Sequence, residues 1–82
     1  MYAVMYARTL TKASHVRKFI ITPKERAGWE VREEADHGVV RHAYYEDWHR
    51  VERARRAFAL EARALHDEGW TEREPVSYST KR

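Results

Sequence analysis

The chain has 82 residues, of which 43% are hydrophobic and 35% are charged, and its formal net charge is +3. This length and composition predict one small globular domain and exclude an intrinsically disordered protein. The chain contains no cysteine, which excludes a disulfide framework, a thiol nucleophile and a cysteine-based zinc site. The longest apolar run, residues 1–7, is too short to cross a membrane and lacks the basic segment of a signal peptide, so a soluble cytoplasmic protein is expected.

The first two predicted strands follow from the side-chain pattern. Residues 15–22 are rich in β-branched and aromatic side chains and end at Pro23, which is typical of a strand with a defined end. Residues 29–35 alternate with a period of two, and Trp29 and Val31 share one face. That alternation predicts a second strand that is buried on one side.

A hairpin turn and a third strand are expected next. Gly38 would supply the left-handed backbone of a three-residue loop formed by residues 36–38. Residues 39–45 then form the third strand. A parallel pair needs a crossover of about a dozen residues or more, so the short loops predict an antiparallel meander.

One long helix is predicted after the strands. Asp47 has the side chain of an N-cap, residues 48–68 contain neither glycine nor proline, and Gly69 supplies a C-terminal stop. Such a helix spans about 30 Å and a strand of about seven residues only about 23 Å, so the helix must cross the sheet diagonally or overhang it. Its inner apolar stripe, with Trp48 beside it, consists of Val51, Ala54, Phe58, Ala62 and Leu65.

These elements define the fold class as α+β. The expected architecture is a three-stranded antiparallel β-meander, four-stranded if the N-terminus joins it, followed by one long amphipathic C-terminal helix. Residues 1–10 are expected to be an edge strand or disordered, and residues 11–70 to form the single domain. Residues 71–82 are expected to be a flexible tail, because they contain Pro75 and many small polar side chains.

The predicted sheet has more apolar surface than one helix can cover. The side chains on opposite faces are Val16 and Ile20 against Phe19 and Ile21, and Val39, Ala43 and Tyr45 against Val40 and Tyr44. Soluble monomers rarely expose an apolar patch of more than roughly several hundred Å². Either residues 1–10 or a second subunit must therefore cover the free face, and we expect a homodimer.

A second, weaker apolar stripe lies on the outer side of the predicted helix. Its small side chains are typical of a seam for a second helix, although alanines are also simply good helix formers. The candidate self-association residues are Ala57, Leu60 and Ala64.

Catalytic and metal-binding chemistry is not predicted. The serines lack the strand–turn–helix elbow of a nucleophile, and the acidic side chains around residues 30–36 are expected to be solvated. His49 and Glu52 meet on one helix face, but a metal site needs three or four convergent ligands. The sequence therefore predicts no enzyme activity, no cofactor, no metal site and no small-molecule substrate.

Basic side chains interleaved with aromatic ones indicate a different class of function. An open sheet with arginines and aromatics is a platform on which single-stranded bases stack. Glu30 and Glu34 oppose this hypothesis, because they would repel phosphates. The candidate nucleic-acid-binding residues are Arg17, Lys18, Arg41, Tyr44, Arg50, Arg53 and Arg56.

The order of the elements over residues 15–70 is similar to the repeat unit of PUR-type and Whirly-type single-strand-binding proteins, and loosely to the WGR domain. The resemblance rests on element order, without a diagnostic motif, and no residue is carried over from those families. They pair or multiply the unit to bind nucleic acid, so the resemblance favours such a function. The stretch 45–52 mixes aromatic, acidic, basic and histidine side chains at the junction of strand and helix, and a site is expected there first.

Two functions are therefore expected. The first is a small non-enzymatic interaction domain that forms a homodimer through the free sheet face or the outer helix stripe. The alternative is a single-stranded nucleic-acid-binding protein that uses basic and aromatic side chains of the sheet and of the helix start. No membrane partner is expected for either.

Overall fold

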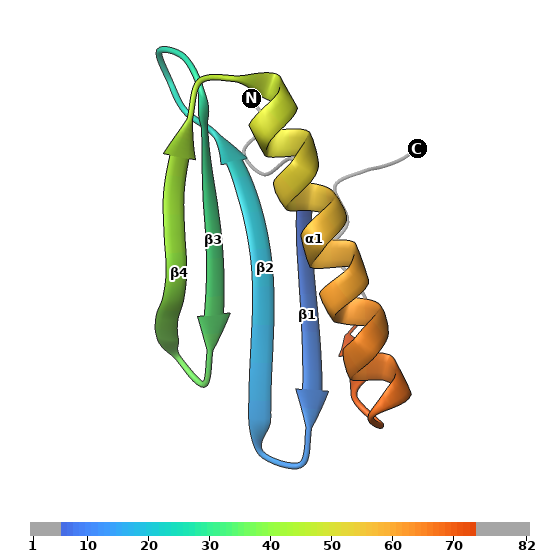
Figure 1. The fold of residues 1–82 in the computed structure, drawn as a ribbon. Helices are drawn as coiled ribbons and strands as arrows, with labels where there is room; N and C mark the ends of the chain where they lie inside the picture. Colours follow the sequence, from blue (N-terminus) through green and yellow to red (C-terminus); the bar gives the residue numbers. More distant parts are fainter. Residues whose placement is uncertain (1–5, 74–82) are drawn as a thin grey trace, which may run out of the picture.

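Five antiparallel strands and one helix make up residues 6–73, the part of the chain that the computed structural model describes (Figure 1). The elements are β1 (Tyr6–Lys12), β2 (His15–Pro23), β3 (Trp29–Ala35), β4 (Gly38–Tyr45), α1 (Trp48–Asp67) and β5 (Thr71–Arg73). The strand order is β4-β3-β2-β1-β5, with every neighbouring pair antiparallel. The α+β class is confirmed, with five strands where three or four were predicted.

Strand β1 lies inside the sheet, between β2 and β5, and not at its edge. Leu10 is fully buried and Tyr6 packs half-buried against the core, so both side chains anchor this strand. The short β5, in the segment expected to be a tail, pairs with β1 and sets Glu72 opposite Leu10. The expected N-terminal strand therefore continues to Lys12 and is covered on its outer edge. Residues 1–5 and 74–82, on which the rest of both predictions falls, lie outside the described residues.

The turn between β3 and β4 is tighter than the sequence predicted. The loop contains two residues, Asp36 and His37, with left-handed φ of 51° and 74°. Gly38 already belongs to β4, so the prediction of a left-handed Gly38 is wrong. A two-residue turn with positive φ at both positions matches the twist of the strands. The Asp36 carboxylate stabilises it, because it accepts a hydrogen bond from the Val16 backbone N–H at 2.8 Å and lies 3.0 Å from His15 Nδ1.

Both predicted helix signals are confirmed. Asp47 Oδ1 accepts a hydrogen bond from the backbone N–H of His49 at 2.9 Å, as an N-cap does. At the other end Gly69 adopts φ of 99°, and the Trp70 backbone N–H donates to the Leu65 carbonyl at 3.0 Å. This is a Schellman motif, and it turns the Trp70 side chain back against the core.

The core lies between the sheet and α1. At its centre Phe19 of β2 meets Phe58 of α1, with ring centroids 4.9 Å apart. Burial of each large apolar side chain stabilises the fold by roughly 1.5–3 kcal/mol. Ala54 is half-buried beside the core, and the rest of the predicted inner stripe is buried. The buried apolar side chains are Leu10, Phe19, Ile21, Val31, Val51, Phe58, Ala62 and Leu65.

The helix crosses one face of the sheet on a diagonal. It starts after the end of β4, and its C-terminal half runs alongside β1 (Figure 1). The face that carries Phe19 and Ile21 is therefore the covered one. Towards β4 the same face is left partly open, because α1 moves away from that strand.

Charged side chains interrupt the opposite face of the sheet. Arg32 lies there between Glu30 and Glu34, with its Nε 3.0 Å from Glu34 Oε2. A β-bulge sets Val39 opposite Glu34, on this face, whereas the sequence pattern placed it with Ala43. The continuous apolar patch that was expected is thus broken up by β3.

The turn between β1 and β2 offers a test of backbone strain. Ala13 has a φ of 54°, a conformation that costs a non-glycine residue roughly 1–2 kcal/mol. We expect Ala13→Gly to stabilise the protein by about 0.5–1 kcal/mol and to raise Tm by a few degrees in thermal unfolding. Ser14→Gly is the control, because Ser14 has no positive φ. Equal Tm changes in the two variants would contradict the assigned turn.

The closure of β5 on β1 predicts acid sensitivity. Arg8 donates to both Glu72 carboxylate oxygens, at 2.8 and 2.6 Å, and this holds the pKa of Glu72 below its usual value. The stabilisation is therefore present above the unfolded-state pKa of about 4.3 and is lost as the pH falls through the lower folded-state value. We expect Glu72→Gln to cost about 1 kcal/mol at pH 7 and less as the pH falls. Urea unfolding between pH 7 and pH 3 measures this, with the exposed Glu68→Gln as a control that should match the wild type at every pH.

Candidate functional site

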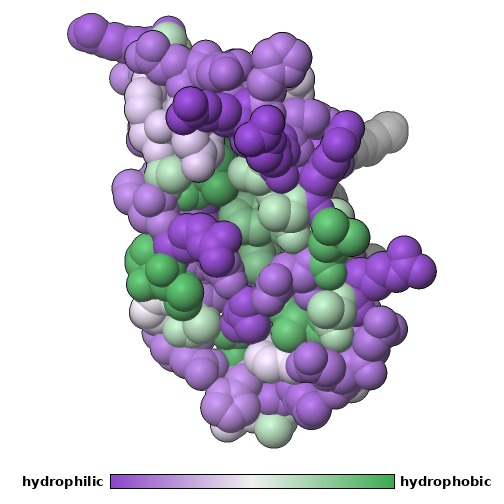
Figure 2. Space-filling model, in the orientation of Figure 1, coloured by the Kyte–Doolittle hydropathy of each residue, from purple (hydrophilic) through white to green (hydrophobic). Residues whose placement is uncertain are grey.

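A groove of about 330 Å³ lies between β4 and α1, where the helix leaves the sheet uncovered. Figure 2 shows apolar surface on this side of the molecule, framed by hydrophilic side chains. We call it the β4–α1 groove. Its lining residues are Val31, Arg41, Ala43, Tyr45, Arg50, Arg53, Ala54, Ala57 and Phe58.

The floor of the β4–α1 groove is apolar. Val31 and Phe58 belong to the core and are 4% and 3% exposed, and Tyr45 packs against them half-buried. Ala43 lines the groove from the sheet and Ala54 from the helix, and their small side chains do not fill the space between the two elements. The hollow therefore offers an apolar surface to a flat or small group.

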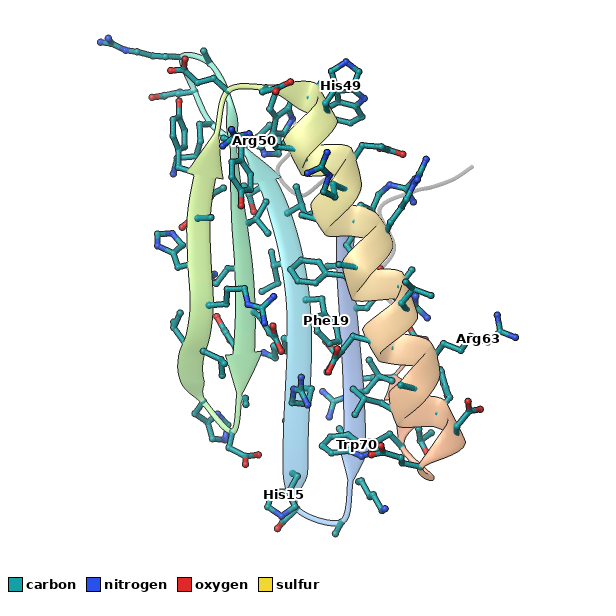
Figure 3. The ribbon with its side chains drawn as sticks, in the orientation of Figure 1. His15, Phe19, His49, Arg50, Arg63 and Trp70 are labelled. Atoms are coloured by element: carbon teal, nitrogen blue, oxygen red, sulfur yellow. The ribbon has the colours of Figure 1, made fainter. Side chains whose placement is uncertain are left out.

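Arginines form the rim. Arg50 and Arg53 stand one turn apart on α1, and Arg41 faces them from β4. Figure 3 shows Arg50 extending from the helix towards β4, whereas Arg63 points away from the sheet. Within residues 6–73, no carboxylate lies within 4.0 Å of the guanidinium groups of Arg50 and Arg53. Arg50 and Arg53 thus give the helix side of the rim a positive charge that no described ion pair compensates.

One buried carboxylate connects the rim to the core. Glu33 is 5% exposed, and its Oε2 accepts a hydrogen bond from Arg17 Nη2 at 2.6 Å. Its other oxygen lies 3.7 Å from Arg41 Nε. Arg17 also lies 3.4 Å from Glu61 and over the Phe19 ring. Arg17 is therefore occupied within the fold, while Arg41, anchored at one end by Glu33, keeps most of its side chain exposed at the groove.

The positive surface continues along α1 beyond the groove. A shallow depression next to it is lined by His49, Glu52, Arg53 and Arg56. Glu52 is neutralised by Arg55, whose Nη2 donates to Glu52 Oε2 at 2.5 Å and lowers the pKa of Glu52. The depression is therefore cationic overall.

Aromatic side chains and two acids surround the start of the helix. Tyr44 is 50% exposed and donates a hydrogen bond to the Ala27 carbonyl, which fixes its ring at the end of β4. Trp48 is 46% exposed and packs on one side against Trp29, with ring centroids 5.1 Å apart. Glu46 and Asp47 lie beside Arg50 in a third depression, which is therefore less cationic than the groove.

The structure separates the predicted nucleic-acid-binding residues into two groups. Arg41, Arg50 and Arg53 line the groove and Arg56 adjoins it on α1, so these four lie together. Tyr44 is opposite Glu30 in the sheet, between two residues that line the groove, so its side chain points to the other face. Lys18 sits on the other face of the sheet, opposite Thr9 and Glu34. Arg17 is engaged by Glu33 and Glu61. Neither residue lines the groove. Lys18 points to the other face because neighbouring residues of a strand alternate, and Arg17 is held by its two acidic partners.

Sequence reasoning missed the apolar half of this site. The sequence pattern placed Ala54 in the inner helix stripe, and Ala43 and Tyr45 on one apolar face of the sheet, without a space between them. The signal that could have indicated the groove was a set of small residues, Ala43 on the strand and Ala54 and Ala57 on the helix, at positions where the two elements face each other. Small residues leave a groove there only if the helix is tilted away from the strand. No local sequence pattern shows that tilt.

The predicted self-association residues are all exposed on the outer side of α1. Leu60 is 69% exposed, the highest value among the large apolar side chains of residues 6–73 that are exposed. Ala57 and Ala64 flank it and are exposed. Ala57 belongs to both surfaces, because it also lines the β4–α1 groove.

Comparisons with protein-family models, with curated proteins and with solved structures gave no match. Among residues 6–73 no three histidine or carboxylate side chains come together as a metal ion would require. The described helix is also not apolar enough, over the length needed, to cross a membrane.

Proposed function

We propose that this protein binds single-stranded nucleic acid along the β4–α1 groove. The observation that carries the proposal is the rim of Arg41, Arg50 and Arg53 around an apolar floor. Guanidinium groups bind phosphate through two parallel hydrogen bonds and also stack on bases. Arginines beside an apolar hollow therefore suit a ligand that has both phosphates and bases.

The spacing of the cations favours a repeating polyanion. Arg50, Arg53 and Arg56 follow one another at intervals of three residues on α1. At 1.5 Å and 100° per residue, successive arginines rise by about 4.5 Å along the helix axis and turn by about 60° around it, so they form a short spiral row. Phosphates of a single strand recur at a comparable interval, about 3.4 Å in a stacked helix and more in an extended strand.

The acidic residues at the start of the helix restrict the path of the nucleic acid. Glu46 and Asp47 lie next to Arg50 and repel phosphates from the turn between β4 and α1. The favourable path for a polyanion therefore runs from Arg50 past Arg53 towards Arg56. Trp48, half-exposed at the same end, offers a ring face to a base next to the groove.

Charge removal inside and outside the groove tests the proposal. We expect Arg53→Gln to weaken binding of a fluorescein-labelled nonathymidylate about tenfold, and to reduce the slope of log K against log salt by about 0.7, because one phosphate contact is lost. Fluorescence anisotropy at 50–200 mM salt measures both quantities. Arg63→Gln, on the outer side of α1, and Lys18→Gln, on the other sheet face, remove the same charge and should change the affinity less than twofold. Equal losses in all three variants, or no binding at 50 mM salt, would contradict the proposed groove.

We also propose self-association through the outer helix stripe of Ala57, Leu60 and Ala64. The exposure of Leu60 favours this second function. Its burial in a twofold contact would remove apolar area from water at about 25 cal/mol per Å². The helix stripe is a better candidate than the free sheet face, because the charges of Arg32 and Glu34 divide that face.

Size-exclusion chromatography with light scattering tests the stripe. We expect a dimer that Leu60→Glu converts to a monomer of 9.8 kDa, because a charge in the centre of the contact would be desolvated without a partner. Val40→Glu adds the same charge at an exposed position on β4 and should leave the dimer intact. A wild-type monomer at micromolar concentration removes the hypothesis.

A further inference from the structure

We infer that the β4–α1 groove takes up one unstacked base, so that the protein binds a strand by its bases as well as by its phosphates. This inference rests on the proposed function and deepens it. Phosphate contacts alone need only an exposed row of cations, which α1 already has. The groove adds something that phosphates cannot use, a recessed apolar floor of Val31, Tyr45 and Phe58.

The polar and apolar parts of the groove are arranged as a base requires. A charged phosphate placed on the floor would lose its hydration without gaining a partner there. The face of a base is apolar, and its edge carries carbonyl and ring-nitrogen acceptors. Arginine side chains are donors only, so Arg41, Arg50 and Arg53 can bond to those acceptors at the rim while the ring lies on the floor.

The size of the groove fits one nucleotide and not a stacked run. Its volume of about 330 Å³ is near the lower end of the range for small-ligand sites, about 300–1,000 Å³. Bases in a duplex are stacked and paired, so they cannot reach a hollow between a helix and a sheet unless they are first extruded. The groove therefore selects unpaired nucleotides.

Alanine side chains keep this space open. Ala54 and Ala57 face the hollow from α1, and Ala43 faces it from β4. Ala57 is exposed, so a larger side chain at that position can be accommodated without disturbing the core. Ala57→Leu then fills the groove without changing any charge, and leucine is a good helix former. Ala59→Leu makes the same change at a helix position that belongs to neither the groove nor the outer stripe.

The experiment compares two labelled strands by fluorescence anisotropy at 50 mM salt: a nonathymidylate, and a nine-unit strand of tetrahydrofuran abasic nucleotides with the same phosphates. We expect the wild type to bind the thymidylate roughly tenfold more tightly than the abasic strand, as base contacts of about 1–3 kcal/mol allow. Ala57→Leu should bind the thymidylate as weakly as the abasic strand and should keep the wild-type affinity for the latter. Ala59→Leu should behave as the wild type does.

The outcomes separate this inference from the proposed function. Equal wild-type affinity for both strands overturns base uptake and leaves a phosphate-binding protein. If Ala57→Leu still binds the thymidylate more tightly than the abasic strand, the bases stack outside the groove, on Tyr44 or Trp48. That result overturns base uptake by the groove. Absence of binding to either strand overturns the nucleic-acid function itself, as does equally tight competition by polyglutamate, which would make an acidic protein segment the ligand.

Discussion

The contact between Phe19 and Phe58 determines most of what the surface of this protein presents. It holds α1 against β2 at the centre of the core, with ring centroids 4.9 Å apart. A helix is about 10–12 Å wide, whereas five strands at about 4.8 Å spacing extend over about 19 Å. One helix anchored on β2 and tilted towards β1 therefore leaves β4 uncovered on its own side. The β4–α1 groove is the direct result of that mismatch in width.

Glu33 distributes the positive charge around this groove. As a buried carboxylate it requires cationic partners, and it forms a close ion pair with Arg17 and a longer one with Arg41. Arg17 is thereby removed from the surface, and Arg41 is held at the groove. Within residues 6–73, Arg50 and Arg53 form no such pair, and Glu52 on the same helix is already paired with Arg55. The charge available to a ligand is thus set by which arginines the fold has already neutralised.

The sequence predicted the elements whose signals are local. Residues 29–35 form the predicted strand, and α1 begins and ends at the predicted Asp47 and Gly69 signals. The local signals did not show the extent and position of β1, the three residues of β5 or the two-residue turn between β3 and β4. Each of these depends on a partner: β1 and β5 pair with each other, and the Asp36 turn is stabilised by the start of β2. Such elements have too little apolar periodicity of their own to be recognised.

The candidate site shows the same division. By itself the sequence determined which residue types are present near the strand-to-helix junction. Because basic and aromatic side chains alternate there, it predicted Arg41, Arg50 and Arg53 as binding residues. Only the tertiary structure decided that these three converge while Lys18 lies on the far face, and that Ala54 lines a hollow. The physical reason is that a site of this kind is defined by the gap between two packed elements. The width of that gap is set by helix tilt and by core packing between residues distant in the sequence, and no window of neighbouring residues contains that information.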